Sequence, residues 1–285
     1  MVTAALPDWA EQALAVEPEA CRVDAPGAQL EVLKWGQRGK PVLLLLHGKE
    51  AHAGWWRLTA PLLAGQFRVV APSWSGMGRS QRRAAYRLSS FAQEIPAVLD
   101  SEGPGTQAFV VGHSFGGYPA LCAARLWPER FRGVCTVDSP LNPAIGWAGP
   151  PPRGIADRIY ETQEAAVARF RFSPADRPVS ALIVDMIARS SLHPVEGGWK
   201  WHFDPTLWRR FEVDIPPSLD VAPVPLGLMR GAVSSLVPED LWSVMVSAAP
   251  PKTWSESIAE AGHHVIIDQP RAFAEAVVRW VAVLG

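Results

Sequence analysis

Ser114 is the residue with the clearest potential for chemistry. It stands in the run G-H-S-F-G, residues 112–116, which fits the pattern G-x-S-x-G. A serine on a strained turn needs small residues two positions before and after it, because strand and helix backbones pass closely there. An apolar run, residues 108–111, precedes the motif, and an Ala-rich segment of helical periodicity, residues 118–127, follows it. This context predicts a strand, a tight turn with a nucleophilic serine and a helix; without it, the pattern indicates only a glycine-rich loop.

A serine hydroxyl needs a base to take its proton before it can attack a substrate. Of the seven histidines, His263 has the most suitable place, because it follows the last expected strand and precedes the closing helix. Loops at the carboxyl ends of parallel strands open onto one crevice, so His263 and Ser114 are expected to meet there. The adjacent His264 is the weaker alternative, and we expect His113 to be oriented beneath the serine loop.

Strand-like and helix-like segments alternate along the chain. Continuous apolar runs are typical of central strands that are buried on both faces. Strands are expected at residues 21–24, 29–36, 41–46, 67–72, 108–111, 132–137, 224–229 and 253–258. Helices are expected near residues 54–63, 88–99, 118–127, 239–248 and 271–283. The alternation predicts an α/β fold: a mostly parallel, twisted sheet with helices on both faces, opened by an antiparallel hairpin.

Residues 141–217 differ in texture from the rest of the chain. They are rich in proline, hold four tryptophans, and show helical patches near residues 153–170 and 179–190. We therefore predict an inserted, mainly helical lid over residues 141–217. The α/β core would then consist of residues 1–140 and 218–285.

Three motifs, taken in order, resemble the α/β-hydrolase family. They are H-G after a buried strand (residues 47–48), G-H-S-F-G-G after a later one, and A-G-H-H before the last helix. The runs H-G-K-E-A-H-A-G-W-W and S-G-M-G-R-S also resemble bacterial serine hydrolases of this fold that carry a helical lid. The resemblance spans nearly the whole chain, from about residue 32 to residue 284.

The resemblance implies a role for four residues. Ser114 would be the nucleophile and His263 the general base. The backbone N–H groups of Lys49 and Phe115 would form an oxyanion hole, in which two fixed donors stabilise the negatively charged oxygen of the tetrahedral intermediate. Phe115 also begins the expected helix, whose positive end favours negative charge.

The acid of the expected triad is where this sequence departs from the commonest family pattern. Most relatives place Asp within G-x-x-D after the penultimate strand, whereas residues 231–235 here read G-A-V-S-S. A serine cannot stabilise an imidazolium as a buried carboxylate does. Asp138, at the end of the strand after Ser114, resembles the acid of other relatives, including the haloalkane dehalogenases, and is the favoured residue. Glu239 or Asp240 in the next helix, or no acid at all, are the alternatives.

Aromatic residues are frequent in segments that should surround the crevice. The predicted substrate-binding residues are Trp55, Trp56, Trp74, His113, Trp147, Trp199 and Trp201. Such a lining favours an apolar or ring-bearing acyl or alcohol group. The alternative is that the lid tryptophans pack the lid onto the core.

Composition limits the class of protein. The formal net charge of −1 gives no indication of nucleic acid or an anionic membrane as a partner. The cysteines, Cys21, Cys122 and Cys135, show no metal or redox spacing and are typical of a reducing compartment. The sequence shows neither the pattern of a secretory signal nor an apolar run of about 18–20 residues, so we expect a cytoplasmic protein. It leaves the oligomeric state open, with a homodimer among the alternatives.

Together these observations predict a serine hydrolase without cofactor or metal. Its substrate would be a small to medium, apolar or aromatic carboxylic ester, cleaved through an acyl-enzyme. Hydrolysis of a lactone, thioester or C–C bond, a lyase, and a non-hydrolytic small-molecule receptor are the alternatives. An epoxide hydrolase or dehalogenase is disfavoured, because those relatives need Asp at position 114.

Overall fold

The computed structural model describes residues 5–147, 149 and 156–285. Its centre is an eight-stranded sheet of order β1-β2-β4-β3-β6-β7-β11-β12. The strands are β1 (Glu19–Ala25), β2 (Ala28–Trp35), β3 (Val42–Leu46), β4 (Arg68–Pro72), β6 (Ala108–His113), β7 (Phe131–Val137), β11 (Leu226–Gly231) and β12 (Trp254–Ile258). The β1–β2 and β2–β4 pairs are antiparallel and the others are parallel. The predicted fold class is therefore confirmed.

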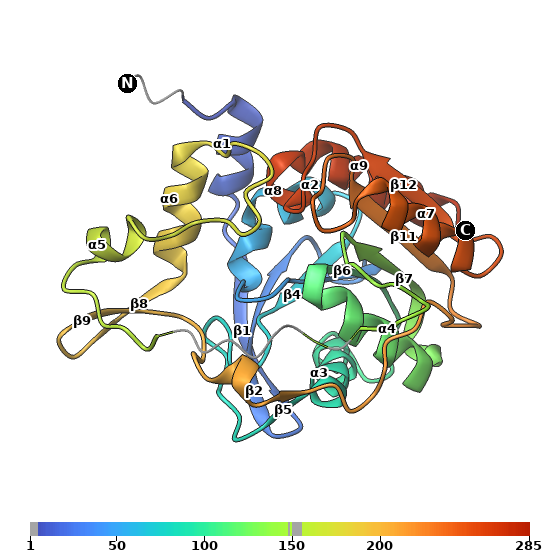
Figure 1. The fold of residues 1–285 in the computed structure, drawn as a ribbon, viewed down its shortest axis with the longest axis horizontal. Helices are drawn as coiled ribbons and strands as arrows, with labels where there is room; N and C mark the ends of the chain where they lie inside the picture. The colour runs from blue at the N-terminus through green and yellow to red at the C-terminus, as the bar shows by residue number, and fades with distance from the viewer. Residues whose placement is uncertain (1–4, 148, 150–155) are drawn as a thin grey trace.

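Helices cover both faces of this sheet (Figure 1). They are α1 (Asp8–Ala15), α2 (Ala60–Leu63), α3 (Leu88–Asp100), α4 (Gly117–Leu126), α7 (Glu239–Ala248), α8 (Val265–Asp268) and α9 (Pro270–Ala282). One hydrophobic cluster joins α3, α4 and α7 to the sheet, and a second joins α2, α8 and α9 to its other face. Every residue of β3 is buried, which is why its sequence, V-L-L-L-L, carries no polar alternation.

The helix predicted near residues 54–63 is two short pieces. A 3₁₀ helix, η1 (Ala53–Leu58), is followed by α2. The side chain of His52 accepts a hydrogen bond from the Gly54 N–H and so caps η1, while Pro61 lies in the first turn of α2, where its missing N–H costs nothing. The composition predicted helical residues correctly, but the proline divides the segment.

The segment between β7 and β11 contains the remaining elements. These are α5 (Gln163–Val167), α6 (Ala181–Ser190), the hairpin of β8 (Leu192–Val195) and β9 (Gly198–Trp201), the 3₁₀ helix η4 (Leu207–Arg209) and β10 (Phe211–Glu212). Figure 1 shows α5, β8 and β9 projecting to one side of the sheet. β10 pairs with β5 (Tyr86–Arg87) of the preceding core segment. Residues 153–155 of the helical patch predicted from residue 153 lie outside the described residues, and α5 covers only part of the rest.

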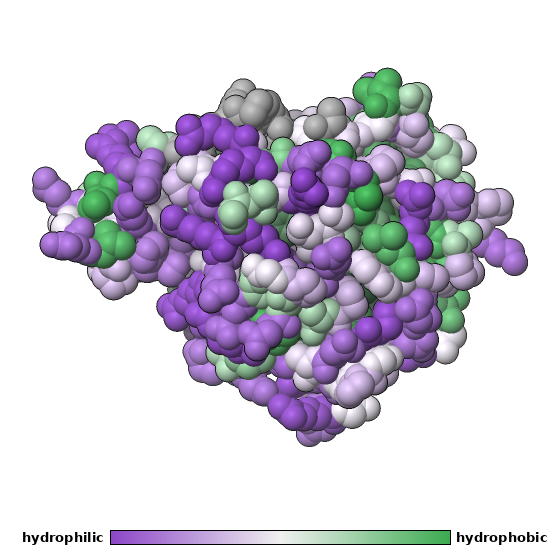
Figure 2. Space-filling model, turned by 90° about the horizontal axis from the view of Figure 1, so that it is seen from below, coloured by the Kyte–Doolittle hydropathy of each residue, from purple (hydrophilic) through white to green (hydrophobic). Residues whose placement is uncertain are grey.

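The surface agrees with the composition. None of the helices described is both long enough and apolar enough to cross a membrane. On the face drawn in Figure 2, hydrophilic residues predominate and hydrophobic ones form small separate groups. Cys21, Cys122 and Cys135 are free thiols, and the latter two are buried among apolar side chains.

Candidate active site

Ser114 occupies a strained turn between β6 and α4. Its φ is +52°, a left-handed conformation that costs a non-glycine residue about 1–2 kcal/mol. A Cβ at Gly112 would lie 2.5 Å from the carbonyl oxygen of Gly116, and a Cβ at Gly116 would lie 2.5 Å from that of Leu46. These distances account for the two glycines of the motif. Strain of this kind at a single half-buried serine indicates a functional position.

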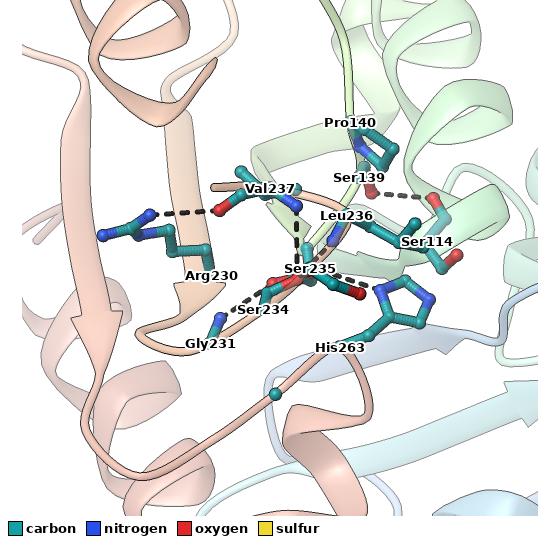
Figure 3. Close-up of polar contacts among 12 residues, drawn as sticks. Ser114, Ser139, Pro140, Arg230, Gly231, Ser234, Ser235, Leu236, Val237 and His263 are labelled. Carbon is teal, nitrogen blue, oxygen red and sulfur yellow. Dashed lines mark hydrogen bonds and ion pairs between the residues drawn. The ribbon is translucent and has the colours of Figure 1, made fainter. Parts of the chain in front are cut away.

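His263 and Asp138 come together at the carboxyl edge of the sheet. His263 Nδ1 lies 2.8 Å from Asp138 Oδ1, and both side chains are buried. Because a carboxylate can only accept, Nδ1 carries the proton and the lone pair of the ring is on Nε2. In Figure 3 the His263 ring lies beside Ser114. The structure thus gathers the three residues that the sequence predicted as a triad.

Asp138 is itself held in place by two donors. Its Oδ2 accepts a hydrogen bond from the Gly231 N–H at 2.8 Å, and its Oδ1 accepts one from Ser234 Oγ at 2.7 Å. The serine found where most relatives carry the acid therefore donates to an acid on the neighbouring strand (Figure 3). Glu239, one of the alternatives, is exposed and pairs with Arg230.

The loop after β3 runs directly past the serine. A Cβ at Gly48 would lie 3.1 Å from Ser114 Cβ and 3.2 Å from His113 Nδ1, so only glycine fits without a shift. The backbone at Gly48, and with it the adjacent Lys49, therefore lies close to Ser114. Its ammonium group pairs with Glu50 at 3.1 Å.

Two further histidines border this constellation. His113 Nε2 donates to the carbonyl oxygen of His263 at 2.8 Å, which ties the end of β6 to the histidine loop. Burial lowers the pKa of His113 well below its usual value and that of His264 to about 3. Both rings are therefore neutral at pH 7, and the one that faces Asp138 is His263.

A second serine–histidine contact has a different chemistry. His52 Nε2 lies 2.9 Å from Ser191 Oγ, but His52 Nδ1 accepts the Gly54 N–H at 3.1 Å. Nε2 must then carry the proton and donate a hydrogen bond to Ser191 Oγ. The Ser191 hydroxyl in turn donates a hydrogen bond to the Ile187 carbonyl at 2.7 Å. Such a histidine cannot deprotonate Ser191, so this pair is structural.

A cavity of about 240 Å³ opens beside the histidine loop. Of the predicted binding residues, Trp55 and Trp201 line it, and so does Lys49. The sequence prediction missed the aromatic residues Tyr160, Phe170 and Phe203 and the histidines His202 and His264. The alternating run R-F-R-F, residues 169–172, is the pattern that could have indicated Phe170. A larger hollow of about 680 Å³ lies among Arg82, Arg83 and Arg209. Neither Ser114 nor His263 is among the residues that line either cavity, and His264 is the neighbour through which the smaller one borders the site.

Five predicted binding residues do not line this cavity: His113, described above, and four tryptophans. Trp56 and Trp74 are fully buried in the core, so their assignment was wrong: Trp56 packs on Phe273, and Trp74 donates to the His47 carbonyl. Trp147 stacks on Tyr118 with ring centroids 3.7 Å apart, and Trp199 lies in the β8–β9 hairpin. The packing of Trp56, Trp74 and Trp147 agrees with the alternative interpretation of the tryptophans.

Comparison with known proteins agrees with this geometry. Residues 43–276 match the model of the alpha/beta hydrolase family, and the chain belongs to that family of enzymes. Pimeloyl-[acyl-carrier protein] methyl ester esterase of Edwardsiella ictaluri is 30% identical over 254 residues, which cover 84% of this chain and 92% of that protein. Epoxide hydrolase B of Mycobacterium tuberculosis is 40% identical over 117 residues, 39% of this chain and 33% of that protein. The chain thus spans about a third of the length of the epoxide hydrolases that it matches.

Solved structures share the fold. The thioesterase domain from the curacin biosynthetic pathway matches with a TM-score of 0.78 at 22% identity, over 93% of this chain and 100% of that one. The esterase Rv0045c of Mycobacterium tuberculosis matches with a TM-score of 0.71 at 24% identity, over 97% and 95% of the two chains.

Proposed function

We propose that this α/β hydrolase is a serine esterase that cleaves small to medium carboxylic esters through an acyl-enzyme. The observation that carries the proposal is the 2.8 Å contact of His263 Nδ1 with Asp138 Oδ1 beside Ser114 on its strained turn. A nucleophile, a base and a buried acid in this order are what acyl transfer requires.

The reaction would proceed in two halves. His263 Nε2 takes the proton of Ser114 Oγ as the oxygen attacks the ester carbonyl, and Asp138 stabilises the imidazolium formed. The N–H groups of Lys49 and Phe115 donate to the oxyanion. Collapse of the intermediate breaks the ester C–O bond, and the imidazolium protonates the departing alcohol. Water, deprotonated by the same histidine, then releases the acid.

Epoxide opening is a poorer match to a serine. A carboxylate that attacks an epoxide forms an ester, which water can hydrolyse to regenerate the enzyme. Ser114 would form an ether instead, and an ether has no carbonyl carbon for water to attack. The identity of residue 114 therefore favours acyl transfer in spite of the partial likeness to epoxide hydrolases.

The cavity supports a substrate with an apolar or ring-bearing group. Trp55 of the core and Tyr160, Phe170 and Trp201 of the insert line it together. Because both parts of the chain form its walls, we propose that residues 141–217 act as a lid on a core of residues 1–140 and 218–285. We place the reaction in the cytoplasm, without cofactor. Lactones and thioesters would undergo the same chemistry.

Turnover of a panel of p-nitrophenyl esters, from acetate to phenylacetate, tests the proposal. We expect turnover by the wild type, a loss of several orders of magnitude in Ser114→Ala, and no change in the exposed control Ser255→Ala. A folded wild type that binds such esters in competition assays without turning any over would favour the rival interpretation, a small-molecule receptor.

A further inference from the structure

Three histidines, one at the end of β6 and two between β12 and α8, form one buried cluster. A ring nitrogen from each of His113, His263 and His264 lies within 4.8 Å of the others. The ring centroid of His263 lies 4.9 Å from that of His113 and 5.0 Å from that of His264. All three side chains are at least nine-tenths buried. No metal-ligand spacing is visible in the sequence, because His113 is brought to the other two histidines only by the folding of the sheet.

His264 has no partner that accounts for its burial. Among the residues that the structure describes, neither of its ring nitrogens makes a hydrogen bond of normal geometry, and the backbone groups of Ser173 and Pro174 are the nearest polar contacts of the ring. The ring packs against Trp55 and Phe172. Leaving a buried polar group unpaired is unfavourable, so a ligand for these nitrogens would be stabilising.

The other two histidines already have the outer contacts of metal ligands. A metal-bound imidazole usually donates its second N–H to a carboxylate or a backbone carbonyl. His263 donates Nδ1–H to Asp138, and His113 donates Nε2–H to the carbonyl of His263. Each ring therefore keeps one lone pair, on Nε2 of His263 and on Nδ1 of His113.

We propose that His113, His263 and His264 form a binding site for a divalent transition-metal ion of the Zn²⁺ type, and that the bound ion blocks catalysis. Imidazole nitrogen is a preferred ligand of such ions. The blocking effect rests on the proposed function, because coordination would occupy the Nε2 lone pair of His263 that accepts the proton of Ser114. The binding itself does not depend on that function.

The cluster borders the cavity of about 240 Å³ through His264. Both ring nitrogens of His264 are buried, so an ion that enters the cavity reaches the cluster only when this ring turns. Zn–N bonds of about 2.0–2.1 Å in tetrahedral geometry place ligand nitrogens about 3.3 Å apart. The ring nitrogens, which lie within 4.8 Å of one another, would therefore move closer together when the ion binds. Lys49 at this cavity wall is paired with Glu50, and Arg169 and Arg171 line the same cavity.

Calorimetric titration of the full chain with ZnCl₂ tests the site apart from the reaction. Ser114→Ala protein is expected to bind one Zn²⁺, and adding His264→Gln is expected to weaken the Kd by at least about tenfold. The matched control adds His193→Gln, which removes a histidine of the separate His193–His202 stack and should leave the Kd unchanged. Co²⁺ in place of Zn²⁺ should give the visible absorption of a tetrahedral site, lost in the His264 variant.

An unchanged Kd in the His264 variant, or a loss with His193→Gln, would overturn the proposal. Should His264→Gln fail to fold, His264→Phe keeps the ring volume among its aromatic neighbours and serves the same comparison. In the wild type, Zn²⁺ should suppress labelling of the serine by a fluorophosphonate, and EDTA should restore it. Zinc binding by a chain that no fluorophosphonate labels would leave the metal site standing and remove the proposed function.

Discussion

At the scale of single residues, the acid is the departure from the family pattern that matters most. Asp138, directly after β7, contacts His263 and accepts a hydrogen bond from Ser234, which lies in the loop where the resemblance led us to expect the acid. The position of Asp138 after β7 could be predicted from sequence; the donor role of Ser234 could not, because it depends on how two loops meet.

Asp138→Asn tests this assignment. The amide would present an N–H where the carboxylate accepts from His263, Ser234 or Gly231, which disfavours the reactive tautomer of the histidine. We expect kcat for ester hydrolysis to fall by about 10³–10⁴-fold, with the fold retained in circular dichroism. Glu239→Gln is the control and should keep its activity. Near-wild-type kcat in Asp138→Asn would refute the assignment.

At the scale of elements, the packing of the serine turn against β3 sets the geometry of the site. In Gly116→Ala, the added Cβ would meet the Leu46 carbonyl at 2.5 Å, so we expect a loss of about 3 kcal/mol in the free energy of unfolding. Gly65→Ala adds the same methyl group where nothing lies within 4 Å and should be neutral. Thermal unfolding of both variants measures the difference; equal melting temperatures would contradict the packing argument.

The insert also holds the histidine loop. Asp176 Oδ2 accepts the His263 N–H at 2.9 Å and the Ser235 N–H at 3.2 Å, which ties residues of three loops together. We expect Asp176→Ala to lower kcat by about tenfold to a hundredfold, because a small displacement of the base misaligns it with the serine. Arg177→Ala, which removes the exposed pair with Glu260, is the matched control and should cost little. Equal kcat values in the two variants would show that the histidine loop keeps its position without Asp176.

The sequence predicted the elements of the core far better than those of the insert. Continuous apolar runs located β3, β4 and β6, because strands buried on both faces leave a local signal. β5 and β10 are two-residue strands that pair across more than a hundred residues, so neither has a local signal. The same limit applies to the cavity, where Trp55 and Trp56 are adjacent in sequence and only the fold decides which one lines it.

At the scale of the whole molecule, buried neutral histidines should make stability depend on pH. Burial lowers the pKa of His47 and His264 to about 3 and that of His52 to about 4, against about 6.5 in the unfolded chain. Below pH 6.5 the unfolded state binds protons that the folded state excludes. Each histidine then lowers the free energy of unfolding by up to about 1.4 kcal/mol per pH unit.

Burial also raises the pKa of two carboxyls, Glu94 and Asp268, and Glu94 opposes this trend most strongly. Burial raises the pKa of Glu94 to about 7, so between pH 7 and 4.5 the folded state binds its proton and gains stability. Three histidines outweigh two carboxyls, and the melting temperature should fall between pH 7 and 5. A melting temperature that is constant or rises toward pH 5 in calorimetry would contradict the burial of these neutral rings.

The central claim is that Ser114 is an activated nucleophile. Intact-mass measurement after incubation with a fluorophosphonate tests it most directly, because the reagent reacts with serines that a neighbouring base activates. We predict a single adduct on the wild type and none on Ser114→Ala. An unlabelled, folded wild type, or an adduct that persists in Ser114→Ala, would contradict the account.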